Sequence, residues 1–348
     1  MKLCKLNSVL TVLLLPALMQ SQTLNKILSQ ADVQIFRQAQ YFIHNAQFQD
    51  AESLLVTARC PGEIKNFLNQ VLFFWRFTYT KNDSFADKSI QYGQMNKELL
   101  KNKNDQSGLF FLAGTQGYLG LTYASQKDGS VTSAMSEGRD GFHGLSDLLD
   151  KYPDFSECHL GLGIYKGMVS QLPTFLKWIL YPFGIKGDRE SAFNSLDTAS
   201  KNEMLTKADA WFWKAAFLKE DTLAYSIYDS LTINYPKNPF YHFLYGHMLY
   251  KNGQLSKAIL ELNEAARLLD KNIFPIVKEG ALTDLGHIYY NLKEYDNSLR
   301  YWHQLESNQN NLSNSQKREV YQYLMKNYRA LNDTSNAEKY SELYENNH

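Results

Sequence analysis

The reactive side chains of this sequence do not form a pattern typical of an active site. Cys158 and His159 are adjacent, and adjacent side chains on a helix point about 100° apart, so they are not placed as a nucleophile and its base. Gly161-Leu-Gly163 is followed by a glycine only at Gly167, one residue too late for the dinucleotide-binding pattern, and no strand is expected before it. Packing glycines on a helix explain this stretch better.

Metal-binding and hydrolase motifs are also absent from the sequence. It contains no His-Glu-x-x-His, no paired cysteines at zinc-ligand spacing and no Gly-x-Ser-x-Gly. Asp188 and Arg189 could suggest chemistry, but an acid near a helix start and an ion pair across a turn explain both. We therefore predict that the protein is not an enzyme and has no catalytic residue, metal site or cofactor.

A pattern of small and aromatic residues occurs twice between Leu205 and Lys271, at a spacing of 34 residues. It indicates the helices that would position binding residues. The second copy opens with Tyr245-Gly246 and turns at Asn252-Gly253. The recurring positions are Ala224, Tyr228, Leu231 and Pro236 in the first copy, and Ala258, Leu262, Ala265 and Asp270 in the second. This pattern resembles the tetratricopeptide repeat (TPR), a helix-turn-helix unit. The resemblance implies an all-α protein, a right-handed solenoid of helical hairpins forming a TPR superhelix.

The sequence divides into three predicted regions, the last of which contains this array. Residues 22–104 are expected to hold N-terminal TPR-like repeats, the first over Asp32 to Ala58, and residues 105–204 irregular helical hairpins with an inserted apolar helix near residues 168–187. Residues 205–348 would form the C-terminal TPR array, closed by a polar capping helix. A helix over about 107–125 carries three glycines that would let another backbone approach closely, namely Gly114, Gly117 and Gly120.

One part of the chain resembles a narrower group of TPR proteins. Over Gly108 to Lys201, a glycine-rich helix ending in tyrosine is followed by an apolar Leu-Pro segment, Gly187-Asp-Arg and Leu196-Asp-Thr-Ala199. This order is similar to that in exported bacterial TPR proteins and in the eukaryotic inclusion-body-clearance group. Since members of these groups are mostly described as adaptors or are uncharacterised, the resemblance supports the fold more than an activity and transfers no catalytic residue.

The TPR pattern also predicts where a partner would bind, because the first helix of each repeat lines the concave face. Two histidines take the same position in successive repeats, and so do two tyrosines. Polar-tipped aromatics beside cations suit a groove for an extended peptide or a carboxylate-bearing partner. Alternatively, these aromatics only stabilise neighbouring helices. The predicted groove residues are Trp213, His247, Tyr250, Lys251, His287, Tyr290, Asn291, Lys326 and Arg329.

The inserted apolar segment is the second candidate site. Its apolar stripe includes Phe175 and Ile179, with Trp178 and Tyr181 at the flank. We expect it to fold across the superhelix as core, because an exposed apolar patch of this size is a liability in a soluble protein. The alternative is that residues 172–183 lie in a membrane interface or bind lipid, which would make the chain an envelope-membrane or lipid-associated protein.

The N-terminus is typical of a secretory signal peptide over residues 1–21. Lys2 and Lys5 precede an apolar run from Val9 to Met19, and this run is too short to span a membrane. We expect an exported protein that is periplasmic, secreted or attached to the envelope. Its two remaining cysteines, Cys60 and Cys158, could pair in an oxidising compartment, but two separate buried thiols are the better expectation.

Charge excludes one class of partner. Lys and Arg together number 36 and so do Asp and Glu, so the sequence lacks the basic excess that nucleic-acid binding requires. We therefore predict a non-enzymatic TPR scaffold outside the cytoplasm that binds protein or peptide partners in a concave groove. A membrane surface is the alternative partner.

Overall fold

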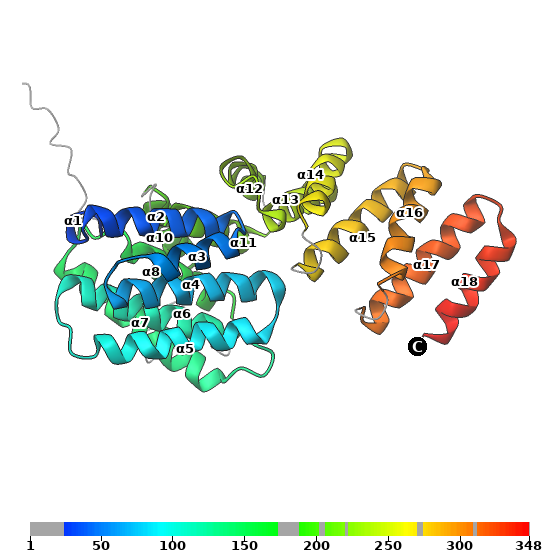
Figure 1. Cartoon of the computed structure of the whole chain (residues 1–348). Coiled ribbons are helices and arrows are strands. Elements are labelled where there is room, and N and C mark those ends of the chain that lie inside the picture. Colours follow the sequence, from blue (N-terminus) through cyan, green and yellow to red (C-terminus); the bar gives the residue numbers. More distant parts are fainter. Residues whose placement is uncertain are drawn as a thin grey trace, which may run out of the picture.

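The computed structural model describes residues 24–172, 188–201, 206–219, 222–269, 274–308 and 312–347, and its regular structure in these ranges is entirely α-helical (Figure 1). The predicted signal peptide and residues 173–187 of the predicted insertion lie outside the described residues. The first three residues of the predicted insertion, 168–170, form the end of a helix that begins at Cys158.

The N-terminal helices form a bundle in which consecutive helices pack as hairpins (Figure 1). The pairs are α2 with α3, α4 with α5 and α6 with α7. Their bounds, with the short α1, are α1 Leu24–Ile27, α2 Gln30–His44, α3 Phe48–Thr57, α4 Gly62–Thr80, α5 Asp83–Leu100, α6 Gln106–Ser125 and α7 Val131–Lys151.

The hairpin pattern continues to the C-terminus: α8, α10 and α11 are drawn together with the bundle, and the pairs from α13 to α18 then follow one another in a row away from it (Figure 1). The pairs are α8 with α10, α11 with α12, α13 with α14, α15 with α16 and α17 with α18. Their bounds are α8 Cys158–Ser170, α10 Arg189–Ser200, α11 Lys207–Leu218, α12 Thr222–Asn234, α13 Pro239–Lys251, α14 Leu255–Leu268, α15 Pro275–Asn291, α16 Tyr295–Glu306, α17 Asn314–Ala330 and α18 Thr334–Asn346. A solenoid of helical hairpins is thus confirmed.

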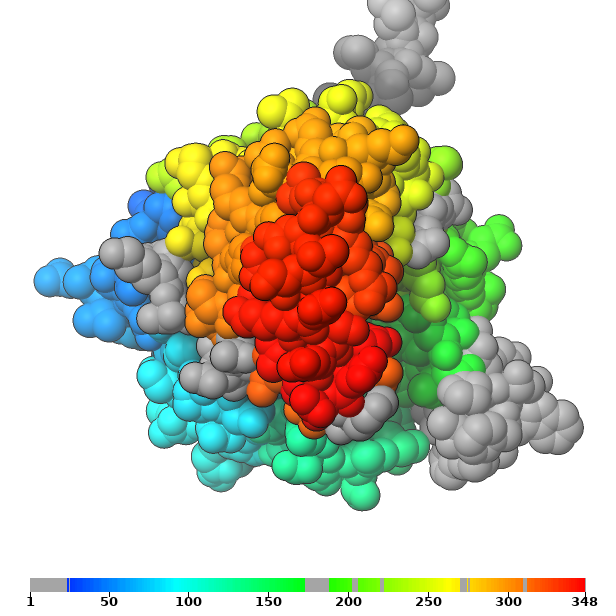
Figure 2. Space-filling model, turned by 90° about the vertical axis from the view of Figure 1, so that its right-hand side faces the viewer, coloured from blue at the N-terminus to red at the C-terminus, as the bar shows by residue number. Residues whose placement is uncertain are grey.

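Viewed from its C-terminal end, the molecule has α18 at the front (Figure 2). Blue and cyan segments of the N-terminal bundle are visible behind it on the left, and the green segment that follows the bundle is visible on the right.

The same tight turn joins the helices of four hairpins. Its middle residue has a left-handed φ in every case, and the next residue donates its backbone N–H to the carbonyl five residues earlier, as Gln254 does to Leu249 at 2.9 Å. The middle residues are Ala46 (φ 57°), Gly253 (φ 72°), Lys293 (φ 62°) and Asn332 (φ 59°). One turn shared by the first hairpin and three of the last four is direct evidence of a structural repeat.

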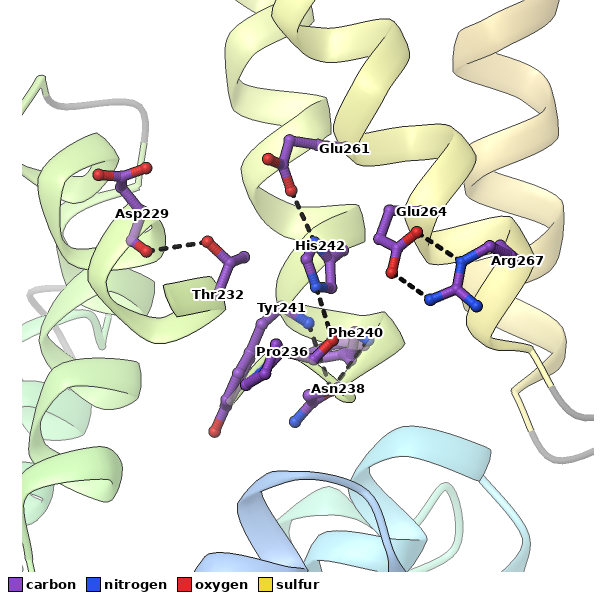
Figure 3. Close-up of polar contacts among 10 residues, drawn as sticks. All are labelled: Asp229, Thr232, Pro236, Asn238, Phe240, Tyr241, His242, Glu261, Glu264 and Arg267. Carbon is purple, nitrogen blue, oxygen red and sulfur yellow. Dashed lines mark hydrogen bonds and ion pairs between the residues drawn. The ribbon is translucent and has the colours of Figure 1, made fainter. Parts of the chain in front are cut away.

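The start of α13 shows how the sequence sets a helix boundary. Asn238 accepts hydrogen bonds from the backbone N–H groups of Phe240 at 2.9 Å and Tyr241 at 3.3 Å (Figure 3). Pro239 follows at the first helical position, where its missing N–H costs nothing.

A histidine one turn further ties α13 to α14 (Figure 3). The Nε2–H group of His242 donates to the carbonyl of Pro236 at 3.1 Å, and Nδ1 lies 2.6 Å from Glu261 Oε2. Glu264 binds the guanidinium of Arg267 on the same helix, and this contact lowers the pKa of Glu264. The contact between His242 and Glu261 joins α13 to α14.

Helix α4 is the centre of the N-terminal bundle, because its side chains are buried on nearly every face. It packs against α2, α3, α5 and α6, and it also touches α15 of the C-terminal array. Trp75 and Tyr79 of the bundle are fully buried and contact two rings of the C-terminal array, Phe212 of α11 and Phe240 of α13. The bundle and the array therefore share one aromatic core.

A buried group of polar side chains lies in this core, where helices α2, α4, α11 and α13 meet. Asp209 accepts from the indole N–H of Trp75 at 3.0 Å and lies 3.2 Å from His44 Nε2. The other His44 nitrogen is 2.7 Å from the Tyr241 hydroxyl, and Asn238 donates to the His44 carbonyl at 2.7 Å. We call these five residues the His44 cluster. No pattern in the sequence predicted it.

Glycines allow α6 and α7 to cross closely, as the sequence predicted for Gly120; at Gly117 it is the lack of a Cβ on the facing Gly141 that permits the approach. A Cβ on Gly120 would fall 2.8 Å from the backbone nitrogen of Gly138, and one on Gly141 would fall 2.7 Å from that of Gly117. Gly114 faces the ring of Phe67 instead.

The two cysteines are separate free thiols, as expected. Cys158 is buried, and this burial raises the pKa of its thiol well above the usual range. It is therefore a packing residue, because a thiol reacts mainly as the thiolate.

Candidate partner-binding site

Three successive first helices, α13, α15 and α17, supply most of the predicted groove residues. Helix α15 approaches α13 closely because Gly280 lies under the ring of Phe243, where an added Cβ would fall 2.4 Å from the ring. This approach brings His247 of α13 next to Asp284 of α15.

His247 and Asp284 form the first of two histidine–carboxylate pairs. His247 Nδ1 lies 2.7 Å from Asp284 Oδ2. The Asp284 side chain is only 9% exposed, whereas that of His247 is 39% exposed. Because a buried carboxylate requires a hydrogen-bonding partner, His247 stabilises Asp284 and leaves its other ring edge toward solvent.

His287 forms the second pair, one repeat further along. Its Nε2 atom lies 3.2 Å from Glu319 Oε1 of α17, as an ion pair rather than a well-aligned hydrogen bond. This neighbouring imidazole lowers the pKa of Glu319. The ring centroid of His287 lies 4.5 Å from that of Tyr323 and 5.1 Å from that of Trp302.

Tyrosines surround His287 on the side of the predicted groove. Tyr290 meets Tyr323 edge to face at 5.4 Å between ring centroids, and the Tyr250 ring lies 6.5 Å from that of His287. Burial raises the pKa of both Tyr250 and Tyr323. Their hydroxyl groups therefore stay protonated near neutral pH and can donate or accept hydrogen bonds.

We call Tyr250, His287, Tyr290 and Tyr323 the His/Tyr cluster. All four are partly exposed. The structure thus brings together three of the predicted residues and adds a fourth. Asn291 lies beside them, and its side chain acts on the Tyr250 hydroxyl by lowering the pKa that burial has raised.

The predicted cations lie at the edge of the His/Tyr cluster. Lys326 Nζ is 4.4 Å from the centre of the Tyr323 ring, and Lys251 Nζ is 6.0 Å from that of Tyr250. Arg329 is exposed one turn beyond Lys326. Each lysine can form a cation–π contact with its tyrosine.

Trp213 lies apart from these residues. Its ring packs against Phe212 and Phe217 of its own helix α11 and against the core between α8 and α10. It is half-buried there, so the structure separates this predicted groove residue from the His/Tyr cluster.

Sequence reasoning missed both carboxylates and Tyr323. Asp284 lies three residues before His287, and Glu319 lies four before Tyr323, so each acid shares a helix face with a ring of the cluster. That spacing was visible in the sequence. The pairing of each histidine with a carboxylate on the next first helix was not visible, because it depends on how these helices pack in three dimensions.

The geometry of this site supports binding rather than catalysis, since the polar groups pair with one another. Among the residues that the structure describes, no three His, Cys, Asp or Glu side chains are grouped as a metal site requires. None of the helices in these ranges combines the length and apolar character needed to cross a bilayer.

The other predicted site, with Phe175, Trp178, Ile179 and Tyr181, lies outside the described residues. The structure follows the chain as far as Leu172, which packs against Val169 of α8.

The repeated hairpins and their shared turn place the protein in the class of TPR-type helical-repeat proteins. The family model for Iml2/Tetratricopeptide repeat protein 39 matches residues 155–346. This range covers more than half of the chain and runs from the start of α8 to the end of α18, so the chain belongs to that family. It overlaps the stretch of narrower resemblance, Gly108 to Lys201, only from residue 155.

Solved structures of other proteins match this chain at low identity and low TM-score. The crystal structure of yeast Tom70 is 13% identical, with a TM-score of 0.43, and the match covers 91% of this chain and 76% of that chain. The crystal structure of the APC/C hetero-tetramer Cut9–Hcn1 is 12% identical, with a TM-score of 0.26 and coverage of 92% and 87%. No curated protein matches the sequence.

Proposed function

We propose that this chain is a non-enzymatic TPR scaffold that binds an extended segment of a protein partner across the His/Tyr cluster. The observation that carries the proposal is the partial exposure of four polar-tipped rings drawn from three successive first helices. Membership of a TPR family supports it, because such repeats commonly present extended binding surfaces.

The chemistry of the cluster indicates what kind of segment would bind. Tyrosines give a large rigid contact area with little loss of side-chain entropy, and their hydroxyl groups can bond to peptide groups. Asp284 and Glu319 neutralise much of the charge of the two histidines when these are protonated. Lys251, Lys326 and Arg329 stand at the edge, so we expect a segment with apolar or aromatic residues at its centre and a carboxylate beside them.

The proposal can be tested with a peptide selected from a random 12-residue library on the parent chain. Affinity of that peptide is then measured by fluorescence anisotropy for a variant with Ala at Tyr250, His287 and Tyr290. We expect the triple variant to bind at least about tenfold more weakly, as loss of central aromatic contacts does at other interfaces.

A matched control carries Ala at Tyr41, Tyr92 and His143, which have the same side-chain types but lie in the N-terminal bundle. This variant should bind like the parent. Circular dichroism of both variants checks that the helices persist. Equal affinity of the parent and the first triple variant would refute the assignment of the binding site.

Export from the cytoplasm remains part of the proposal and rests on the N-terminal sequence. The mass of the protein recovered from its native cells should correspond to a chain that begins at Gln22. The membrane alternative rests on residues 172–183; flotation of the full chain with liposomes, lost on Trp178→Asp substitution, would favour it over a groove-binding scaffold.

A further inference from the structure

A large cavity lies in the N-terminal half, well away from the His/Tyr cluster. It has a volume of about 1020 Å³ and is bordered mainly by α6, α7 and α8, with contributions from α2 and α4. Protein interiors are normally packed as densely as organic crystals. A space of this size is at the upper end of the range for small-molecule sites and is too large for a packing defect.

Missing side chains create this space. Gly117 of α6 lines the cavity, and a Cβ added to it would meet no atom within 4 Å. The neighbouring glycines on the crossing, Gly120 and Gly141, are needed for backbone contact. Gly117 therefore stands out, because the space beside its own Cα is open.

The inner wall of the cavity is apolar and aromatic. Phe36 and Phe67 stack at 6.0 Å between ring centroids, and Phe110 lies beyond them, with Leu145 on α7 and Ile164 on α8 completing the wall. Such a lining suits a hydrocarbon chain, because burial of apolar surface is its main source of affinity.

Apolar side chains also stand at the outer edge of the cavity and face solvent. Val131 and Met135 of α7 are 72% and 52% exposed, and Met168 of α8 is 36% exposed. Three exposed apolar residues around one opening are unusual on a soluble surface. They extend the apolar path from the inner wall to the outside.

The charges on the cavity wall favour an anionic ligand. Arg139 and Lys127 both border it and are exposed. Arg139 uses two of its five N–H donors on its sequence neighbour Asp140, at 3.0 and 3.2 Å, and retains others for a ligand. Its charge reaches the cavity, because it lowers the pKa of Tyr165, which burial raises.

The cavity wall also includes one acidic residue, Glu157, and its carboxylate is already occupied by a contact within the protein. Glu157 is buried and accepts a hydrogen bond from the backbone N–H of Leu24 at 2.8 Å. It is thereby committed to holding α1 against the start of α8.

From this cavity and its two cations we infer that the protein binds a fatty acid, with the hydrocarbon chain against the phenylalanines and the carboxylate at Arg139 and Lys127. This site is independent of the peptide-binding role proposed for the C-terminal array.

The test uses cis-parinaric acid, a polyunsaturated fatty acid whose fluorescence rises when it leaves water. Titrated into the full chain, it should give a saturable increase with one site per chain. Gly117→Phe should weaken this binding by about tenfold or more, because a Cβ at this position meets no atom within 4 Å and the new ring would occupy the cavity. Val56→Phe, which adds the same ring at a site on α3 that is 75% exposed, should have no effect.

The head group is tested with a variant that does not alter the core. Arg139→Gln should weaken binding of the acid by about fivefold, the effect of losing one exposed charge contact, and leave binding of the alcohol with the same chain unchanged. Absence of saturable binding by the parent would overturn the inference. So would parent-like binding by a folded Gly117→Phe variant, or equal effects of Arg139→Gln on acid and alcohol.

Discussion

His44 Nε2 and Asp209 Oδ2 lie 3.2 Å apart although 165 residues separate them in the sequence. His44 ends α2 in the N-terminal bundle and Asp209 is in the first turn of α11, which leads into the C-terminal array. Each residue is only 1% exposed. Their contact, with the Trp75 bond to Asp209, fixes the bundle against the array from inside the core.

Asp209 should therefore be far more important for stability than an acid on the surface. We expect Asp209→Ala to lower the free energy of unfolding by about 3–5 kcal/mol, because it leaves His44 and the Trp75 indole buried without their acceptor. Asp209→Asn should cost less, since the amide retains one oxygen. Urea denaturation followed by circular dichroism measures both.

Asp197 provides the control, because it pairs with Lys214 at 2.5 Å but its side chain is 50% exposed. Asp197→Ala should cost about 1 kcal/mol or less. If Asp197→Ala and Asp209→Ala lower the free energy of unfolding by similar amounts, the His44 cluster contributes no more to stability than an exposed ion pair.

Much of the fold follows from local sequence pattern. The residues that recur at a spacing of 34, such as Leu231 and Ala265, are buried as a repeat requires, and Ala258 and Leu262 are completely enclosed. The prediction is correct because each repeat buries its small and apolar residues against its own second helix and the neighbouring repeat. These contacts are short-range, so they appear in the sequence as a regular spacing of buried residues.

The contacts that sequence did not reveal depend on distances between hairpins. His44 and Asp209 meet only because α11 lies against α2 and α4 of the bundle. His247 contacts Asp284 only because α15 lies close to α13, where Gly280 leaves room for the ring of Phe243. Trp213 takes the position expected of a groove residue in α11, but the neighbouring α8 and α10 cover that part of the helix.

Two glycines of α6 should respond in opposite ways to the same substitution. Gly120→Ala should cost about 1–3 kcal/mol, because its Cβ would fall 2.8 Å from the Gly138 backbone and force α6 and α7 apart. Gly117→Ala should stabilise the helix by about 0.5–1 kcal/mol, since its Cβ meets nothing. Thermal unfolding of the two variants, compared with the parent, checks the sign; destabilisation of equal size would argue against the open space at Gly117.

The shared turn offers a second matched pair. Gly253 and Lys293 have nearly the same φ, 72° and 62°, but only a residue with a Cβ is strained there. Gly253→Ala should lower the free energy of unfolding by about 1 kcal/mol, whereas Lys293→Gly should raise it by about 0.5 kcal/mol after the entropy cost of glycine. Chemical denaturation measures both, and changes of the same sign would contradict the equivalence of the two turns.

The pair of His287 and Glu319 should make stability depend on acid pH. Because the pKa of Glu319 is lowered in the folded chain, its carboxylate stabilises the fold above the usual glutamate pKa of about 4.3. That contribution is lost as the pH falls below this value through the lowered pKa. Glu319→Gln should therefore reduce the loss of stability on acidification, by about 1 kcal/mol or less because its side chain is 42% exposed.

If the pair of His287 and Glu319 causes the acid dependence of stability, removing His287 should abolish the contribution of Glu319. In a His287→Ala background, Glu319→Gln should no longer change the acid dependence, and Glu338→Gln, on the exposed face of α18, should not change it in either background. Urea denaturation between pH 3 and pH 6 gives the four free energies of a double-mutant cycle. A coupling energy of zero at every pH would mean that Glu319 is stabilised by other groups, and the His/Tyr cluster would then lack the internal charge balance on which the expected partner chemistry depends.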